Sequence, residues 1–308
     1  MNRPRPPRTD LEAPLDHAES RRRLVGIALM CTALVCFSAL DATAKYLNQV
    51  LDPLQTVWVR YIGSVVLVSL FVNAFTTPGV SRTARPWLQG ARSLLLFGST
   101  VFNFLALQYL QLAEAMAITF SVPFLVALLA GPMLGERLGP RRLAAIAIGF
   151  LGVLVVVRPG LGGLHPAFLL SLMGVVCYGL YAITTRMLAQ VDHPRTILFY
   201  SGLGGVALAT PIVPFVWIEP PSLAFWLLLG SVAVYGTVGH WLLILAHARA
   251  PAAVLSPFLY TQIVWMLALG WLVFGDFPDV FTLIGAAIVI ACGLYLLARE
   301  RAIRGRRP

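Results

Sequence analysis

Ten long apolar stretches, separated by short polar segments, constrain this chain more than any other feature. Each is roughly 17–25 residues long, the length at which a helix crosses the ~30 Å hydrocarbon core of a bilayer. The apolar residues continue without the alternation of barrel strands, so the stretches predict helices. Only 12% of the 308 residues are charged, about half the share in soluble domains. The sequence therefore predicts an all-α integral membrane protein with ten transmembrane helices.

Turn-forming pairs such as Asp52-Pro53, Pro159-Gly160 and Pro220-Pro221 separate the stretches. The predicted spans are 24–47, 55–75, 88–110, 112–134, 142–158, 166–189, 196–217, 222–246, 251–274 and 278–298. The segments between them are too short for a catalytic or sensory domain. The first span is also too long for the apolar part of a signal peptide, so we expect it to be retained.

The charge distribution predicts which side of the membrane each segment faces. A net charge of +10 in a soluble protein would suggest a nucleic-acid partner. Here the basic residues lie between apolar stretches, so we expect no such partner. Twenty of the 23 Lys and Arg residues fall on one side of the ten-helix topology. Short segments rich in Lys and Arg stay in the cytoplasm, so both termini are expected there.

The polar ends and the cysteines suggest no further site. Residues 1–20 mix proline with charge and predict a disordered cytoplasmic tail, and residues 300–308 predict a basic one. The four cysteines lie inside apolar stretches without a CxxC pair, which favours small buried hydrophobes over a disulfide or metal site. Walker, GxGxxG, HExxH and GxSxG motifs are absent from the sequence. We therefore expect no cofactor, no metal and no enzyme activity.

The two halves of the chain resemble each other at an offset of 140–141 positions. Cys36-Phe37 matches Cys177-Tyr178, and Leu134-Gly135-Glu136 matches Phe274-Gly275-Asp276. Each half holds five predicted helices, and an odd number inserts the second half upside down. Such inverted repeats are typical of alternating-access transporters. Chance similarity between apolar helices is the alternative.

These residues also carry a family resemblance. The five-plus-five plan and the block ending in Leu134-Gly135-Glu136 resemble the EamA-type transporters of the drug/metabolite transporter superfamily. The resemblance implies EamA-like repeats at 21–158 and 159–299. Residues 37–45, with Gln55 and Arg60-Tyr61, are similar to a bacterial subgroup of riboflavin and S-adenosylmethionine uptake proteins and some metallophore exporters.

The resemblance implies secondary-active transport of a small organic metabolite across the bacterial inner membrane. Uptake of a riboflavin-like or S-adenosylmethionine-like compound is one hypothesis, and export of a metallophore, amino acid or drug is the alternative. A channel and a polytopic sensor are disfavoured. Without an ATPase motif, a proton gradient or a counter-substrate would drive the flux. Membrane lipid is an expected partner, and the sequence leaves open whether the chain forms a homodimer.

Four charges fall in the outer half of the first repeat: Asp41, Lys45, Arg60 and Glu114. A charge at mid-bilayer costs about 2.5–3.5 kcal/mol, so each needs a reason. We expect a cluster that faces an external vestibule or the central cavity. Asp41 precedes Lys45 by four positions, which favours an intrahelical pair. Asp41 either locks helices by neutralising Lys45 or Arg60, or carries substrate or protons; Glu114 could also lie in interfacial water.

Further polar and aromatic residues could line a substrate pocket. The candidates are Trp58, Asn103, Tyr178, Tyr181, His240, Tyr260, Gln262 and Trp265. Aromatic walls with a few polar groups suit a planar organic ligand, although aromatics also pack against lipid. His240 could titrate near neutrality or only form a hydrogen bond. Pro123 and Pro257 should bend the fourth helix of each repeat, as gates or as lipid-adapted kinks.

Overall fold

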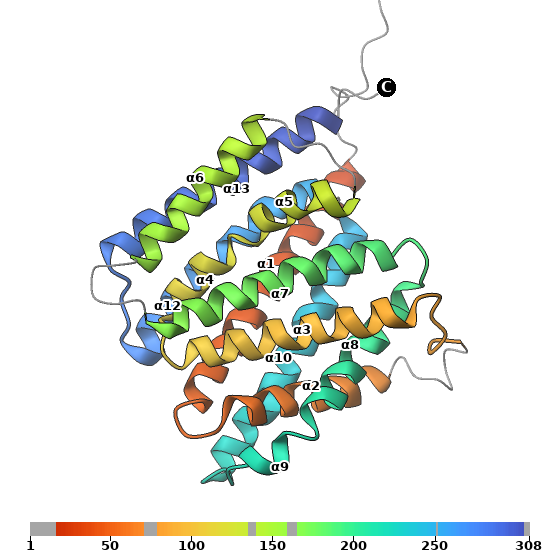
Figure 1. The fold of residues 1–308 in the computed structure, drawn as a ribbon, viewed down its shortest axis with the longest axis vertical. Helices are drawn as coiled ribbons and strands as arrows, with labels where there is room; N and C mark the ends of the chain where they lie inside the picture. The colour runs from red at the N-terminus through yellow and green to blue at the C-terminus, as the bar shows by residue number, and fades with distance from the viewer. Residues whose placement is uncertain (1–16, 71–78, 135–139, 159–164, 251, 305–308) are drawn as a thin grey trace, which may run out of the picture.

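The computed structural model describes residues 17–70, 79–134, 140–158, 165–250 and 252–304, and within these ranges the regular structure is entirely helical (Figure 1). The elements are α1 (His17–Leu47), α2 (Pro53–Ser69), α3 (Pro86–Leu107), α4 (Leu112–Thr119), α5 (Val122–Leu134), α6 (Pro140–Val157), α7 (Pro166–Leu188), α8 (Pro194–Ala209), α9 (Val213–Val216), α10 (Leu223–Arg249), α11 (Ala252–Leu255), the 3₁₀ helix η1 (Ser256–Thr261), α12 (Gln262–Phe274) and α13 (Val280–Arg304). Most of the predicted tail 1–20, residues 71–75 of the second predicted span, Gly135-Glu136 and residues 305–308 lie outside the described residues.

Helices occupy all ten predicted positions, which confirms the all-α class. Six segments of the described part are long and apolar enough to cross a membrane, and three further apolar helices are shorter. Asp52 begins α2 by accepting a hydrogen bond from the Leu54 amide at 2.8 Å, and a proline follows it at the first helical position. The turn signals of the sequence therefore set helix ends as expected.

Three predicted spans are divided. The span 112–134 breaks into α4 and α5 at residues 120–121, and Pro123 is the second residue of α5. The span 251–274 contains η1, whose second residue is Pro257. Proline has no backbone N–H and cannot continue the α-helical ladder, which accounts for both interruptions. The span 196–217 divides into α8 and α9, and Pro214 lies within α9.

The second helices of the two halves, α2 and α8, run antiparallel. The Cα of Gly205 faces the ring of Tyr61, whereas Gly202 faces Val65, so residue numbers rise along one helix as they fall along the other. The fifth helices of the two halves, α6 and α13, also run antiparallel.

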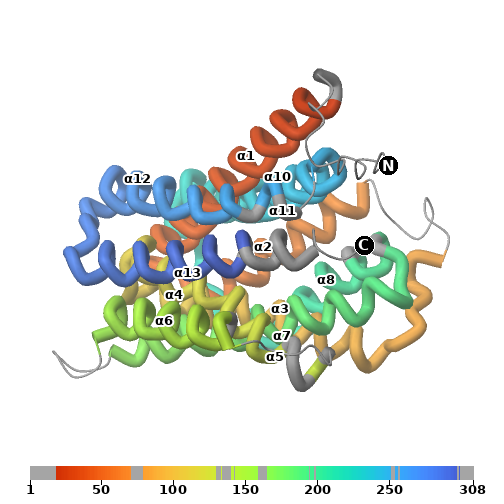
Figure 2. The backbone as a smooth tube through the Cα atoms, turned by 90° about the horizontal axis from the view of Figure 1, so that it is seen from above, coloured from red at the N-terminus to blue at the C-terminus, as the bar shows by residue number. Residues whose placement is uncertain are grey.

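In α6 and α13, Gly152 lies against Ile288 and Val156 lies against Gly285. Two corresponding helices of an inverted repeat are expected to oppose each other in this way. The packing of α1 on α10 is likewise mirrored by the packing of α7 on α3. Figure 1 shows α6 beside α13 at one edge of the bundle and α2 with α8 and α9 toward the other, and Figure 2 shows the bundle from above.

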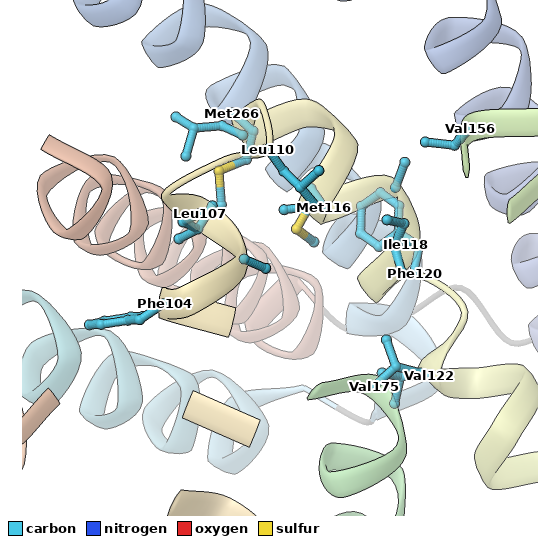
Figure 3. Packing of buried hydrophobic residues seen from close by; sticks show 14 of the residues in the cluster. Phe104, Leu107, Leu110, Met116, Ile118, Phe120, Val122, Val156, Val175 and Met266 are labelled. Carbon is cyan, nitrogen blue, oxygen red and sulfur yellow. The ribbon is translucent and has the colours of Figure 1, made fainter. Parts of the chain in front are cut away.

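A buried apolar cluster surrounds the α3–α4 junction (Figure 3). Phe104, Leu107 and Met116 belong to it, together with Val175 of α7 and Met266 of α12. Lipid tails are as apolar as these side chains, so tight packing rather than exclusion from water holds them together. These five residues also line the cavity described below, which makes the cluster its apolar wall.

Gly285→Ala should lower the melting temperature of the purified protein by several degrees. Its new Cβ would lie 2.6 Å from the Gly152 carbonyl oxygen and 3.1 Å from the Val156 nitrogen. Backbone atoms cannot move aside cheaply, and overpacking of this kind costs about 1–3 kcal/mol. Gly230→Ala is the matched control, because a Cβ there meets nothing within 4 Å. Equal melting temperatures for the two variants would contradict this packing.

Candidate functional site

A cavity of about 230 Å³ lies between helices of both halves. Its lining comes from α1, α2, α3, α4, α5, α7, α10 and α12. Six residues predicted from the sequence are among the lining residues: Asp41, Arg60, Asn103, Tyr178, His240 and Gln262. Ser99, Thr100, Thr119 and Ser171 add hydroxyl groups. A cavity with apolar walls and a few convergent polar groups is the usual form of a small-molecule site.

Asp41 is held by a neutral partner rather than by a cation. The Asn103 side-chain amide donates to its Oδ1 at 3.2 Å. Lys45 does not pair with it, so the predicted intrahelical ion pair is wrong. Lys45 lies in the last turn of α1, where the α12–α13 connection brings the Asp276 carboxylate to 2.8 Å from its Nζ. The spacing in the sequence could not show this long-range competitor.

Arg60 reaches the same cavity from α2. Its Nη1 donates to Thr100 Oγ1 at 3.0 Å, and its guanidinium carbon lies 5.2 Å from the ring centre of Tyr61. Its buried Nε has no hydrogen-bond partner, and within the described residues it has no carboxylate within 4.0 Å. A Cβ on Gly236 would lie 3.4 Å from that nitrogen, so the glycine makes room for the guanidinium.

The remaining polar members come from the second half of the chain. The His240 ring packs edge-on against Phe37 with ring centres 5.0 Å apart, and Gly239 lets these two helices approach. Tyr178 lies 5.6 Å from Tyr181, measured between ring centres. Gln262 begins α12 directly after the 3₁₀ segment.

Four predicted pocket residues lie outside the lining of this cavity. Trp58 donates from Nε1 to Thr210 Oγ1 at 3.0 Å, at the junction of α2 and α8. Tyr181 lies under the Arg92 guanidinium, and Tyr260 packs edge-on against Phe120. Trp265 is 41% exposed on α12. An apolar helix presents aromatics to several surroundings, and composition alone does not separate a cavity from a helix junction or the outer surface.

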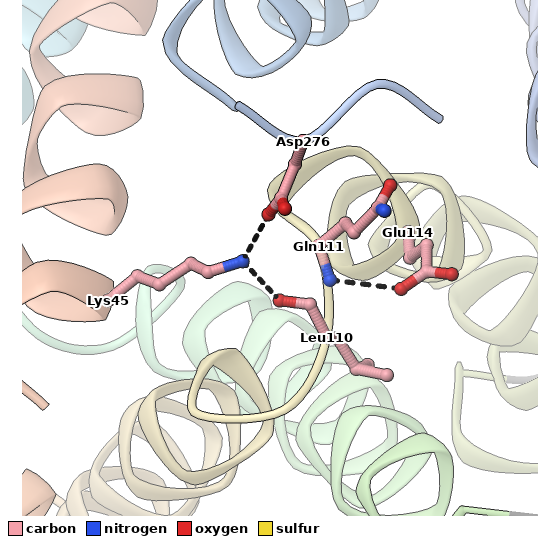
Figure 4. Close-up of polar contacts among 5 residues, drawn as sticks. All are labelled: Lys45, Leu110, Gln111, Glu114 and Asp276. Carbon is pink, nitrogen blue, oxygen red and sulfur yellow. Dashed lines mark hydrogen bonds and ion pairs between the residues drawn. The ribbon is translucent and has the colours of Figure 1, made fainter. Parts of the chain in front are cut away.

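Lys45 lies in the last turn of α1 and Glu114 in the first turn of α4, at one end of the bundle. Figure 4 shows their polar contacts. Besides Asp276, the Lys45 ammonium contacts the Leu110 carbonyl oxygen at 3.0 Å. Glu114 accepts a hydrogen bond from the Gln111 backbone N–H at 2.9 Å. This N–H lies at the start of α4, where the helix itself provides no acceptor. The four predicted charges thus form two groups: Asp41 and Arg60 at the cavity, and Lys45 and Glu114 at this end.

A polar network at the opposite end of the bundle was not predicted from the sequence. Arg92 is only 1% exposed and donates to Thr185 at 2.8 Å, Ser201 at 2.7 Å and the Ile197 carbonyl at 3.1 Å. It ties α3 to α7 and α8. Arg92 is one of the 20 basic residues assigned to one side of the membrane, but it lies inside α3 rather than between spans. Its position inside the predicted span 88–110 was the available signal.

Asp192, in the connection between α7 and α8, belongs to the same end of the bundle. It accepts from the Ala84 amide and from Gln89 Nε2, both at 2.9 Å, and from the Thr83 hydroxyl. Burial alone would raise the pKa of this carboxyl, but the three hydrogen bonds outweigh it and hold the pKa below its usual value of 3.8.

Asp192→Ala should lower the melting temperature at neutral pH, because three donors lose their acceptor at about 1–3 kcal/mol for each one left buried. A lowered folded-state pKa means that the stabilisation is present above the unfolded pKa and is lost as pH falls through the folded one. The difference between the native chain and the variant should therefore shrink below a pH of about 4. Glu219→Ala, which removes an exposed carboxylate, is the control. A pH-independent difference would contradict the role of the charge.

Comparisons with known proteins agree with this architecture. Residues 24–158 and 165–299 each match the EamA-like transporter family. A solved crystal structure at 22% identity has a TM-score of 0.60 and covers 94% of this chain and 100% of its own, which shows the shared fold.

Relatives with assigned names align over nearly their whole length. The S-adenosylmethionine uptake transporter of Rickettsia conorii is 27% identical and covers 92% of this chain and 96% of its own. The riboflavin transporter of Rhizobium johnstonii is 30% identical and covers 94% and 96%. An uncharacterized transporter of Helicobacter pylori is 25% identical and covers 89% and 94%. The predicted resemblance is confirmed: the chain belongs to the EamA-like transporter family of the drug/metabolite transporter superfamily and is a multi-pass membrane transporter, not an enzyme.

Proposed function

We propose that this chain is a secondary-active carrier of a small organic metabolite, with the central cavity as its substrate site. The observation that carries the proposal is the cavity itself, whose charged and polar lining comes from helices of both antiparallel halves. In transporters built from inverted repeats, the substrate site lies at the repeat interface near the midplane. A proton gradient or a counter-substrate drives the flux.

Uptake is the direction that the relatives favour. Two of the named relatives carry S-adenosylmethionine or riboflavin, and the first is named for uptake. Import of a compound of one of these two kinds is therefore our proposal, and export of a metallophore, amino acid or drug is not favoured.

The membrane is the bacterial inner membrane, and the arginine-rich end of the bundle faces the cytoplasm. The positive-inside rule supports this orientation and leaves both termini cytoplasmic. Of the tails expected at 1–20 and 300–308, residues 17–20 are the first turn of α1 and residues 300–304 the last of α13. The repeat units are 21–158 and 159–299. The end that holds Lys45 and Asp276 then faces outward.

The helix interruptions near Pro123 and Pro257 act as hinges beside the cavity. Thr119 and Val122 flank the break between α4 and α5, and both line the cavity. Gln262, another lining residue, directly follows η1. A short 3₁₀ stretch or a missing backbone hydrogen bond bends more easily than a continuous helix. Each hinge therefore lets one end of its helix move while the lining residues stay near the substrate.

Counterflow in proteoliposomes tests the carrier proposal. Vesicles with the purified full chain are loaded with unlabelled riboflavin or S-adenosylmethionine, and labelled compound is added outside. A carrier gives saturable uptake that the same compound inside the vesicle stimulates. Protein-free liposomes give the background. Uptake that stays linear with concentration, or that shows no stimulation with either compound, would contradict the proposal.

A further inference from the structure

Two opposite charges face the central cavity without forming an ion pair. Asp41 and Arg60 both line it, yet within the described residues neither has an oppositely charged group within 4.0 Å. Each instead has a neutral hydrogen-bond partner, Asn103 for the carboxylate and Thr100 for the guanidinium. Charges in a membrane protein normally pair with one another, so this separation needs a reason.

One helix holds the two charges side by side. Thr100 and Asn103 are three positions apart on α3, on the same face and ~4.5 Å apart along its axis. Each lies within 3.2 Å of its charged partner. The helix therefore positions an anion and a cation about one turn apart, with both directed at the same space.

The guanidinium also keeps unused hydrogen-bonding capacity. An arginine has five N–H donors, and within the described residues Arg60 directs them at the Thr100 hydroxyl, through Nη1, and at the neighbouring Tyr61 side chain, which leaves others free. Its Nε is buried without a partner. A carboxylate is the group that a guanidinium binds best, through two parallel hydrogen bonds.

The two charges together define the ligand. A purely cationic ligand would neutralise Asp41 and leave Arg60 unpaired, and a purely anionic ligand would do the reverse. A zwitterion pairs both at once. The cavity of about 230 Å³ is smaller than the ~300–1,000 Å³ typical of drug-sized ligands, which suits a compact head group.

A second cavity provides room for the rest of a larger molecule. It has a volume of about 640 Å³, lies between α2, α3, α8 and α10, and shares Arg60, Leu96 and His240 with the first. Its other lining residues are mostly apolar and include Val65, Phe199 and Trp241. A ligand bound by its head group at Arg60 could extend an organic substituent past the guanidinium into this space.

We propose that the central cavity recognises the α-amino-carboxylate head group of an amino acid or amino-acid conjugate, with the carboxylate on Arg60 and the ammonium on Asp41. The inference rests on the proposed carrier function and selects within it: S-adenosylmethionine carries this head group, and riboflavin has neither of its charges.

Thermal stabilisation of the purified full chain tests the inference with matched compounds. L-methionine has both charges, L-methioninamide lacks the carboxylate, and N-acetyl-L-methionine lacks the ammonium. S-adenosylmethionine and riboflavin complete the set. S-adenosylmethionine and L-methionine should bind, and comparison of the two shows whether the conjugate or the free amino acid is preferred. The affinity for each blocked analogue should be lower than that for L-methionine by a factor of about ten or more. This is the loss of affinity expected when one hydrogen bond to a charged group is removed.

Two variants assign each charge to its partner. In Arg60→Gln the preference for L-methionine over its amide should disappear, while the preference over the N-acetyl compound remains. In Asp41→Asn the preference for L-methionine over the N-acetyl compound should disappear, while the preference over the amide remains. Glu219→Gln, an exposed carboxylate outside both cavities, should keep both preferences.

Equal binding of L-methionine and its blocked analogues would overturn the inference, as would binding of riboflavin alone. Riboflavin counterflow without competition by L-methionine would also overturn it, although the carrier proposal would stand. Absence of counterflow with either compound would instead count against the carrier proposal. The two failures are therefore distinguishable.

Discussion

Asp41→Asn is expected to reduce substrate flux about 10- to 100-fold while leaving the amount of folded protein unchanged. The new amide has the same shape and can still accept from Asn103, which now holds the carboxylate at 3.2 Å. Only the charge is lost, and a hydrogen bond to a charged group contributes about 1.5–3 kcal/mol. The measurement is the initial uptake rate in proteoliposomes, with melting temperature as the check on folding and Glu219→Gln as the control.

The double variant Asp41→Asn with Arg60→Gln separates binding from a structural role. If Asp41 serves only to balance Arg60 across the cavity, removing both charges should restore flux, because no uncompensated charge remains. If both bind substrate, the double variant should be as inactive as the single ones. Restored flux in the double variant would contradict the assignment of Asp41 to the substrate site.

Lys45→Met is expected to open the outer end of the cavity. The lysine links α1 to the Leu110 carbonyl and to Asp276, so one side chain joins both halves of the protein. If the form closed at this end loses about 1–2 kcal/mol of stability, the equilibrium between closed and open forms shifts roughly five- to thirtyfold toward the open one. A cysteine at Thr119, a cavity-lining position, reports the change in a chain whose native cysteines are replaced by alanine.

The rate at which an impermeant maleimide labels this cysteine from outside should rise in Lys45→Met and return toward the starting value in Lys45→Arg, which keeps the charge. An unchanged rate in the folded Lys45→Met chain would show that the bridge does not close this end.

The fold could be predicted because its signals are local. Helix length follows from the apolar stretches, and ends follow from residues such as Asp52 and Pro53 at the start of α2. The repeat was also visible in the sequence, and its antiparallel arrangement follows from the odd number of helices per half. Pro123 and Pro257 predicted a bend in each of their helices, and the structure instead divides those helices at residues 120–121 and 256–261.

The site was predicted only in part, because its contacts are between distant segments. Spacing along one helix suggested that Asp41 pairs with Lys45, whereas the actual partner of Lys45 is Asp276, 231 positions away. The rotation of each helix decides whether an aromatic faces a cavity or the surface, and α12 directs Trp265 outward. Sequence periodicity is weak where both faces of a helix are apolar.

Two-sided labelling of a cavity residue tests the central claim, that one site between the repeats is exposed alternately to the two sides of the membrane. The Thr119→Cys chain is placed in vesicles of known orientation, and an impermeant maleimide is added outside or inside. The account predicts labelling from both sides, with Lys45→Met raising the outside rate at the expense of the inside rate. Labelling from one side alone, in the native and the Lys45→Met background alike, would contradict alternating access.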